Sequence, residues 1–541
     1  MRTTTLTLRA PSPHVFIMAA CLLLPWINPF AAGPSPTVHP WLASALCAAA
    51  FAAAGGLRRI PWGLALACML VAAWAFARSG VTLDTLALAG GLVLVALAAS
   101  AARAFAATPE GAPTIAGTWV AAAVISTFIA LAQYFDVAAL FAPFASASPN
   151  GDAFANLRQR NQFASLTAIG FASLAWFVGR RGLGIASAMA AVLLAVGNAA
   201  TTSRTGMLEL LVLAALAAAW PGERRAERIR LAALALVAYF AATWTLPWLH
   251  DLAGSGDSLS IWRRTPGGEG CSSRRVLWAN VLQLVAQRPW TGWGWGELDY
   301  AHFSTLYDGA RFCDILDNAH NLPLHVAVEL GVPATLLLAA AGAWATLRAR
   351  PWAEADGTRR LAWSVLAVLF VHSMLEYPLW YGPFQLAAGL CLGVLSARGD
   401  VEAPRGRWRA LLPAAVALAV AFVAYDYRRM SQIYLQPEAR AAAYRENTLE
   451  HVRRSRIFSA QARFAELTLA PLTRENAQWS LDESLALLHY SPEPKLIEKA
   501  VESATMLGRD DVALWHLARF RAAFPEAHAE WAAKLGLAGD S

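Results

Sequence analysis

Apolar runs of the length needed to cross a lipid bilayer recur through most of the first 426 residues. The hydrocarbon core of a bilayer accommodates about 20 apolar residues of helix and provides no water for an unpaired backbone. A chain with many such runs is therefore restricted to a bundle of membrane-spanning helices. We place the spans near residues 14–31, 41–57, 61–77, 82–101, 114–135, 162–179, 183–200, 205–220, 230–249, 321–346, 361–377, 383–397 and 409–426.

The composition supports this interpretation. Hydrophobic residues make up 57% of the 541-residue chain, charged residues only 15%, and the mean hydropathy is +0.41. A soluble protein of this size carries more charge and interrupts its apolar runs with it. We predict an all-α polytopic membrane protein with about 12–13 transmembrane helices.

The uneven distribution of arginine between the connections predicts the topology. One alternate set of connections holds Arg2, Arg9, Arg58, Arg59, Arg103, Arg180, Arg181, Arg224, Arg225, Arg228, Arg230, Arg348, Arg350, Arg359, Arg360, Arg398, Arg405, Arg407 and Arg409. The other short connections hold only Arg78, Arg158, Arg160 and Arg204. Basic loops stay in the cytoplasm, so the second set faces outward. Topology therefore explains the net charge of +7, and nucleic-acid binding is not needed to account for it.

Two parts of the chain differ from the spans. The interval 250–320 is long, polar and external on this topology. After residue 426 charged residues increase, and apolar residues recur at helical spacing, as in Leu496, Ala500, Ala504 and Leu507. This last part resembles degenerate tetratricopeptide repeats. The predicted domains are an N-terminal transmembrane bundle (1–249), a large external loop (250–320), C-terminal transmembrane helices (321–426) and a soluble helical domain (427–541).

The outward-facing arginines are the first candidate site residues. Arg158 and Arg160 precede the sixth span, Arg204 precedes the eighth, and Arg274 and Arg275 begin a predicted helix of the external loop. A charged group near lipid is costly, and the planar guanidinium fork matches the geometry of a phosphate. Arginines that converge from separate segments bind an anion; the alternative is that each extends to the lipid headgroups.

His320, at the end of the external loop, is the candidate for proton transfer. A neutral imidazole accepts a proton from an attacking hydroxyl near neutral pH, and a structural role at the interface is the alternative. Asp314, Asp317 and Glu329 are the nearby acids that would orient it. His325 is a weaker candidate, because five residues farther along a helix its side chain faces away from His320.

The sequence contains no motif for a metal or a nucleotide. His-Glu-x-x-His, Cys-x-x-Cys, Asp-x-Asp and Gly-x-x-x-x-Gly-Lys are all absent. We therefore predict no metal and no cofactor. Cys271 and Cys313 are the two cysteines outside apolar segments, and we predict that they form a disulfide in an oxidising compartment.

The segment that begins at His320 resembles the signature of the O-antigen ligase and O-antigen polymerase superfamily. It reads His320-Asn321, nine further residues, and then Gly331-Val332-Pro333-Ala334, where Ala334 departs from the usual Gly, Thr or Tyr. Agreement extends to Ser203-Arg204, Arg274-Arg275-Val276-Leu277-Trp278, Arg288–Gly296 and Leu375–Tyr381. The last segment and the C-terminal domain most resemble the bacterial protein O-oligosaccharyltransferases, which are the pilin glycosylation ligases.

This resemblance implies a glycosyltransferase of the bacterial inner membrane whose active site and external loop face the periplasm. It would transfer a glycan en bloc from undecaprenyl pyrophosphate to a Ser or Thr hydroxyl of a periplasmic or pilin-type protein. His320 would act as the base, and Arg274 and Arg204 would stabilise the leaving pyrophosphate. The residues implied in binding the pyrophosphate or glycan are Arg158, Arg160, Arg275, Asn321, Trp293, Glu376 and Tyr377.

Alternative functions stay open at this point. An O-antigen ligase acting on lipid A-core, or an O-antigen polymerase, shares the donor and differs only in the acceptor. The C-terminal domain and the segment Glu376–Tyr381 favour a protein acceptor. A transporter or flippase is a more remote alternative, because the polar residues gather at one membrane face and no internal repeat is found.

The topology gives the first prediction. An alkaline phosphatase fused after Ser541 should be active, and a green fluorescent protein fused there should be dark, because the odd span count and the arginine asymmetry place the C-terminus outside. The opposite pair of results would contradict the external position of residues 427–541.

Overall fold

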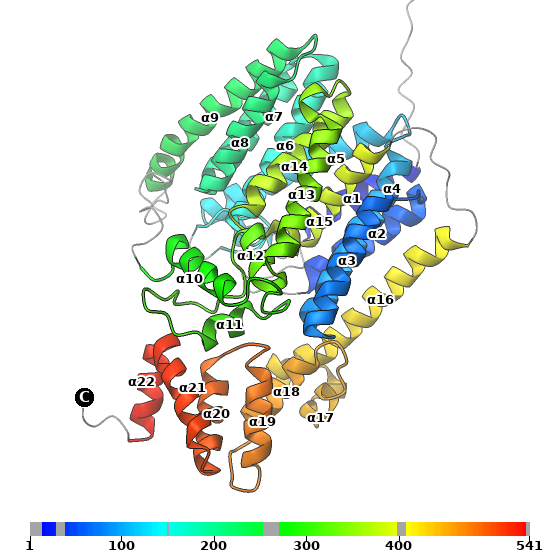
Figure 1. Ribbon diagram of the computed structural model, residues 1–541. Helices are drawn as coiled ribbons and strands as arrows, with labels where there is room; N and C mark the ends of the chain where they lie inside the picture. Colours follow the sequence, from blue (N-terminus) through cyan, green and yellow to red (C-terminus); the bar gives the residue numbers. More distant parts are fainter. Residues whose placement is uncertain (1–12, 29–37, 149–150, 253–269, 398–406, 537–541) are drawn as a thin grey trace, which may run out of the picture. The chain divides into compact units, whose positions relative to one another are not determined.

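The computed structural model describes residues 13–28, 38–148, 151–252, 270–397 and 407–536 (Figure 1). These residues form helices α1 to α22 and short 3-10 turns, and no strand occurs among them. Arg2, Arg9, Arg398, Arg405 and residues 253–269 of the predicted external loop lie outside the described residues. The chain divides into a first unit (Met1–Cys68, Gly90–Arg264, Ala345–Val420) and a second unit (Met69–Ala89, Thr265–Trp344, Ala421–Ser541).

Among the described residues, seven helices are long and apolar enough to cross a membrane. They are α3 (Trp62–Ser79), α4 (Leu83–Phe105), α5 (Gly111–Tyr134), α6 (Arg160–Arg181), α9 (Arg225–Leu252), α13 (Val332–Ala349) and α16 (Trp408–Ser431). Shorter apolar helices are α1 (Pro13–Ile27), α2 (His39–Gly55), α7 (Ile185–Ala200) and α15 (Gly382–Ser396). The prediction of an all-α polytopic membrane protein is thus confirmed. The number of spans stays a prediction, because α8 (Arg204–Ala219) and α14 (Gly357–Ser373) coincide with predicted spans but fall in neither group.

Helix α6 is the central helix of the first unit. Helices α5, α7, α8, α9 and α14 pack against it. Of the 18-residue stretch that makes α6 long and apolar enough to cross a membrane, 83% is buried inside the protein. Small residues permit this close packing: a Cβ atom on Gly170 would lie 2.5 Å from Ala123 Cβ and 3.0 Å from Leu194 Cδ1. The packing fixes α6 along its length and therefore also fixes its first residues, Arg160 and Asn161.

The predicted tenth span consists of two helices. Helix α12 (Leu322–Leu330) ends at Gly331, whose φ is +94°, and α13 begins at Val332. Val328 and Leu330 of α12 are buried in protein, whereas α13 has no buried residue. The prediction of one continuous helix over 321–346 is therefore wrong, because the apolar residues of α12 pack against neighbouring protein segments.

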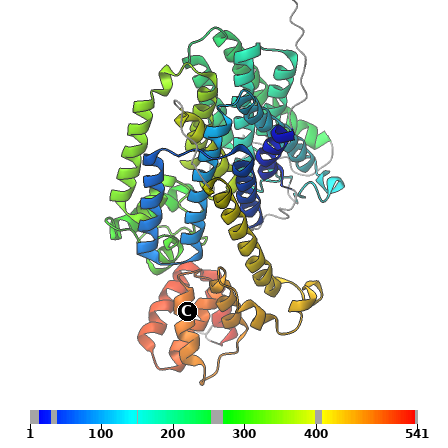
Figure 2. The ribbon, with the colours of Figure 1, turned by 90° about the vertical axis from the view of Figure 1, so that its right-hand side faces the viewer.

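The second unit contains the loop helices and the C-terminal helices. These are α10 (Arg274–Gln287), α11 (Leu298–Ser304), α12, α17 (Thr448–Val452), α18 (Ser459–Leu469), α19 (Ala477–Leu487), α20 (Pro494–Met506), α21 (Asp510–Ala523) and α22 (Pro525–Lys534). Helices α18 to α22 pack in sequence order, each against the next, as the orange to red part of Figure 2 shows. Leu496, Ile497 and Phe520 form the centre of their core. The similarity to tetratricopeptide repeats stays a prediction.

Asp426, near the end of α16, fixes the start of the C-terminal helices. Its carboxylate is buried, and Oδ2 accepts hydrogen bonds from the Ser455 hydroxyl at 2.8 Å and from the amides of Arg456 and Ile457 at 2.9 and 2.8 Å. Hydrogen bonds to a charged acceptor are stronger than neutral ones. The side chain therefore ties α16 to the segment that leads into α18.

Replacing Asp426 with Ala should lower the free energy of unfolding of the second unit by about 3 kcal/mol, because two amides and a hydroxyl lose their acceptor. Thermal unfolding of the purified protein in detergent checks this. Asp482→Ala is the control, because Asp482 is exposed and, among the described residues, accepts only from the Gln478 side chain. Equal unfolding temperatures for the two variants would contradict the prediction.

Candidate active site

In the first unit the structure brings three of the predicted segments together around Glu376. Glu376 is buried, and its oxygens accept from Asn161 Nδ2 at 3.1 Å and from Gln159 Nε2 at 3.4 Å. The Ser203 hydroxyl donates to Asn161 Oδ1 at 2.6 Å. The start of α6, the start of α8 and the turn after α14 thus meet at one place.

The predicted arginines of the first unit lie on these same segments. Arg160 is the first residue of α6, and its guanidinium pairs with Asp152 at 3.0 Å. Arg158, two residues earlier, has a φ of +67°. Arg204 is the first residue of α8 and is exposed, and the preceding Ser203 caps the helix by accepting from the Gly206 amide at 3.1 Å. A helix N-terminus adds its own positive electrostatic field to such a side chain, which favours anions.

Tyr377 adjoins the Glu376 cluster. Its ring stacks on Tyr381 with centroids 5.8 Å apart and meets Trp380 edge-on at 6.3 Å. The short 3-10 turn Pro378–Trp380 brings Tyr377 and Tyr381, which flank it in the sequence, close to each other. Stacked aromatic rings are suited to the face of a sugar.

A buried polar cluster that the sequence analysis missed lies deeper among the same helices. Ser165 on α6 is hydrogen-bonded to Glu209 Oε1 of α8 at 2.5 Å and to His372 Nδ1 of α14 at 2.7 Å. All three side chains are fully buried. Glu209 could have indicated this cluster in the sequence, because it is an acidic residue inside an apolar run. Placing an ionisable side chain in a membrane-spanning segment costs free energy, so such residues commonly have a function.

In the second unit His320 lies in a constrained turn before α12. Its φ is +49°, and its amide donates to Asn318 Oδ1 at 2.8 Å. Asn321 then caps α12 by accepting from the Leu324 amide at 3.0 Å. A non-glycine residue in the left-handed region is held there by its surroundings and is enriched at functional sites.

Helix α10 holds the residue before His320 in place. The indole of Trp278 donates to the Ala319 carbonyl at 3.1 Å. Arg274 is the first residue of α10, four residues before Trp278, so both lie on the same face of the helix. Arg275 is exposed and lies about 100° around the helix from Arg274. The structure therefore associates Arg274 with the His320 turn.

A disulfide joins Cys271 and Cys313, with their Cα atoms 5.3 Å apart. The adjacent Ser272 hydroxyl donates to Asp314 Oδ2 at 3.0 Å. The start of α10 is thereby connected to the segment that leads to His320.

Partial enclosure by protein raises the pKa of the Asp317 carboxyl, although part of that side chain is exposed to solvent. The nearby imidazoles of His320 and His325 act in the opposite direction, because they favour the carboxylate. An orienting role of Asp317 toward His320 stays a prediction.

His325 corrects an expectation from the sequence. We expected it to face away from His320, but its Nδ1 accepts from the Ala319 amide at 3.5 Å, beside the His320 turn. Its Nε2 then carries the proton and faces Glu329 Oε2 at 3.3 Å, with both side chains buried. The turn between Asp317 and α12 is tight, so that Ala319 lies against His325 in the first half of α12.

The Trp-Gly repeat at 290–296 forms a cap for α12. The amides of Trp293 and Gly294 donate to the carbonyls of Val328 and Glu329 at 2.8 and 3.0 Å, and the Val332 amide donates to the Pro289 carbonyl at 2.8 Å. A Cβ atom on Gly292 would collide with the Glu329 carbonyl group, so glycine is required at this contact.

The indoles of this repeat mainly hold the loop. Trp295 is buried against His325, and Arg288 covers one face of Trp293 at 3.9 Å from the ring centroid. The ring of Trp295 is therefore not available for stacking on a glycan, whereas Trp290 is 77% exposed. A glycan-binding role for Trp293 stays a prediction.

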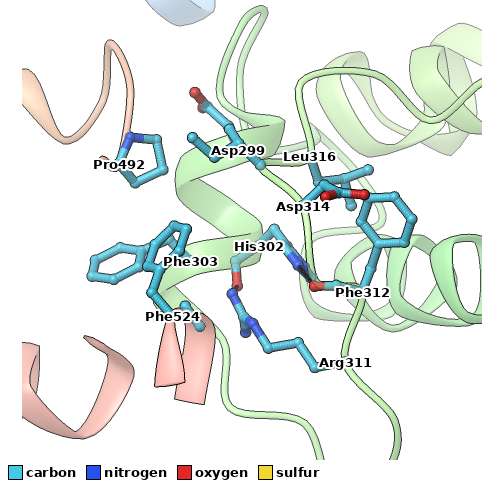
Figure 3. A pocket seen from close by; sticks show the side chains of 11 residues that line it. Asp299, His302, Phe303, Arg311, Phe312, Asp314, Leu316, Pro492 and Phe524 are labelled. Atoms are coloured by element: carbon cyan, nitrogen blue, oxygen red, sulfur yellow. Dashed lines mark hydrogen bonds between the residues drawn. The ribbon is translucent and has the colours of Figure 1, made fainter. Parts of the chain in front are cut away.

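A small hollow of the second unit lies beside His302 and Arg311 (Figure 3). Burial, with the Arg311 cation beside it, lowers the pKa of His302 to about 3. The imidazole is therefore neutral, donating to the Phe312 carbonyl at 3.0 Å and accepting from the Tyr307 hydroxyl at 2.8 Å. Arg311 donates to the carbonyls of His302 and Thr305. These contacts fix the loop and include none of the predicted site residues.

Three regions of the chain match known protein families. Residues 189–339 match O-Antigen ligase, residues 153–177 match Protein glycosylation ligase, and residues 360–535 match Virulence factor membrane-bound polymerase, C-terminal. The resemblance proposed from the sequence motifs is thereby confirmed. The three matched regions contain every predicted site residue.

Two curated proteins of Acinetobacter baylyi are also similar to this chain. The ComP-specific O-oligosaccharyltransferase is 26% identical over 286 residues, which are 52% of this chain and 51% of that protein. The General O-oligosaccharyltransferase is 26% identical over 136 residues, which are 24% of this chain and 23% of that protein. The chain thus aligns with about half of the first relative and about a quarter of the second.

The cap on α12 gives a prediction for Gly331. Gly331→Ala places a Cβ atom against the Trp290 carbonyl at a φ of +94°, so it should lower stability by at least about 1–2 kcal/mol and reduce activity by displacing α12. Thermal unfolding and glycan transfer measure the two effects. Gly342→Ala is the control, because an added Cβ there meets open space within a helix. Wild-type behaviour of Gly331→Ala would contradict the requirement for glycine.

Proposed function

We propose that this protein is a glycosyltransferase that transfers a glycan from undecaprenyl pyrophosphate to a Ser or Thr hydroxyl of a protein at the periplasmic face of the bacterial inner membrane. The observation that carries the proposal is the His320 turn, with Arg274 on the adjoining face of α10, inside the region that matches O-Antigen ligase. The match to Protein glycosylation ligase and the two similar oligosaccharyltransferases support a protein acceptor.

In this mechanism His320 accepts the proton of the acceptor hydroxyl as the oxygen attacks the anomeric carbon of the glycan. The bond from that carbon to the pyrophosphate breaks, and the pyrophosphate leaves with the negative charge. Arg274, Arg204 and Arg160 stabilise that charge, because guanidinium groups form paired hydrogen bonds with phosphate oxygens. No proton needs to reach the leaving group during this step.

The division of the chain follows from the same proposal. Residues 1–249 and 321–426 provide the transmembrane helices, residues 250–320 the catalytic loop, and residues 427–541 a periplasmic helical domain for the acceptor. Arg158, Arg275, Asn321, Glu376, Tyr377 and Trp293 complete the binding of pyrophosphate and glycan. Transfer to lipid A-core or to a growing glycan is the second candidate, favoured by the match of residues 360–535 to a membrane-bound polymerase.

His320→Ala should lower transfer by about 10²–10⁴-fold while the protein still binds the lipid-linked donor, because an imidazole that only moves a proton contributes little to holding pyrophosphate. Arg274→Ala should weaken donor binding as well as turnover, and Arg274→Lys should recover only part of the loss. The measurements are donor binding and transfer to a protein acceptor and to lipid A-core, at matched expression.

His14→Ala is the control, because His14 is an exposed histidine at the start of α1 that hydrogen-bonds to the Ala54 carbonyl at 3.0 Å and belongs to none of the proposed sites. Near-normal transfer by His320→Ala would remove the assigned base. Transfer to lipid A-core alone would replace the protein acceptor with the second candidate.

A further inference from the structure

The Ser165 cluster joins three helices inside the first unit, where α6, α8 and α14 lie side by side (Figure 1). The Ser165 hydroxyl has two partners, Glu209 at 2.5 Å and His372 at 2.7 Å, and these come from different helices. Among the described residues, Glu209 Oε2 and His372 Nε2 are buried without a hydrogen-bond partner. Ser165 is therefore the contact on which both side chains depend.

One hydroxyl satisfies both partners in either of two arrangements. Ser165 donates to a Glu209 carboxylate while the His372 Nδ1 proton is donated to Ser165, or a protonated Glu209 donates to Ser165 while Ser165 donates to His372 Nδ1. Both arrangements use the same atoms at the same distances. Because an unpaired polar group is costly inside a bundle without water, the cluster favours one relative placement of the three helices.

Each of these helices also carries part of the Glu376 cluster. Asn161 lies one turn before Ser165 on α6, and Ser203 caps the same helix that carries Glu209. The Glu376 amide donates to the His372 carbonyl at 2.8 Å. A shift of any one helix would thus lengthen the hydrogen bonds that join Asn161 to Ser203 and Glu376.

We propose that Ser165, Glu209 and His372 are positioning residues for donor binding. They hold the ends of α6, α8 and α14, and with them Arg160 and Arg204, in the geometry that binds the pyrophosphate of the donor. This inference rests on the proposed function. None of the three touches the reacting atoms, so their effect is on the affinity for the donor and not on the chemical step.

The test compares two buried serines of α6. Ser165→Ala should raise KM for an undecaprenyl-pyrophosphate-linked glycan about fivefold or more and leave kcat within about twofold, because it leaves two buried groups unpaired. Ser173→Ala should leave both constants unchanged, since the Ser173 hydroxyl is equally buried but donates only to the Ile169 carbonyl of its own helix at 2.9 Å. Unfolding temperatures are measured for each variant.

Glu209 provides a second, independent comparison. Glu209→Gln keeps an oxygen that accepts from Ser165 and should retain a KM close to that of the wild type, whereas Glu209→Leu should raise KM as Ser165→Ala does. This pair decides the question if Ser165→Ala fails to insert into the membrane.

Lower unfolding temperatures with an unchanged KM would reduce the cluster to a structural role and overturn the inference. Equal effects of Ser165→Ala and Ser173→Ala on KM would overturn it as well. If the wild-type protein itself transfers no glycan, the proposed function fails. If the wild type transfers glycan and KM does not distinguish the variants, only the positioning role fails.

Discussion

A polar group inside a bundle of membrane-spanning helices has no water to bind, so it must find its partner on a neighbouring helix. Asn161 with Glu376, and Ser165 with Glu209 and His372, are the results of this constraint around α6. Each pair contributes little as a single hydrogen bond. Together they make one helix arrangement more stable than others, because any other arrangement leaves buried polar groups without a hydrogen-bond partner.

The second unit holds a short polar turn in place by different means. It uses backbone contacts more than side-chain pairs: the amides of Trp293 and Gly294 close the end of α12, and Trp278 binds the carbonyl before His320. The disulfide between Cys271 and Cys313 adds a covalent link close to the same place. The positive φ of His320 costs conformational free energy. It persists because hydrogen bonds at Ala319 and at Asn321 hold the turn on both sides.

The positions of the helices could be predicted from the sequence because each apolar run marks a segment that is excluded from water. The break at Gly331 could not, since hydropathy does not distinguish packing against protein from packing against lipid. Arg160, Arg204, Arg274 and His320 were chosen as candidates from their residue types and their predicted membrane side, and their roles stay predictions. Ser165 was missed because the role of a hydroxyl depends on its partners on other helices, and one sequence does not contain that pairing.

The separation of α12 from α13 has a consequence for what holds the His320 turn in place. Nine helical residues, or up to about 14 Å at the usual rise per residue, stand between the His320 turn and the first residue of α13, the apolar helix that has no buried residue. Helix α12 therefore acts as a spacer. It separates the His320 turn from α13 by a helix whose second half is buried in protein, so that packing within the second unit, and not the apolar helix that follows, sets the position of the turn.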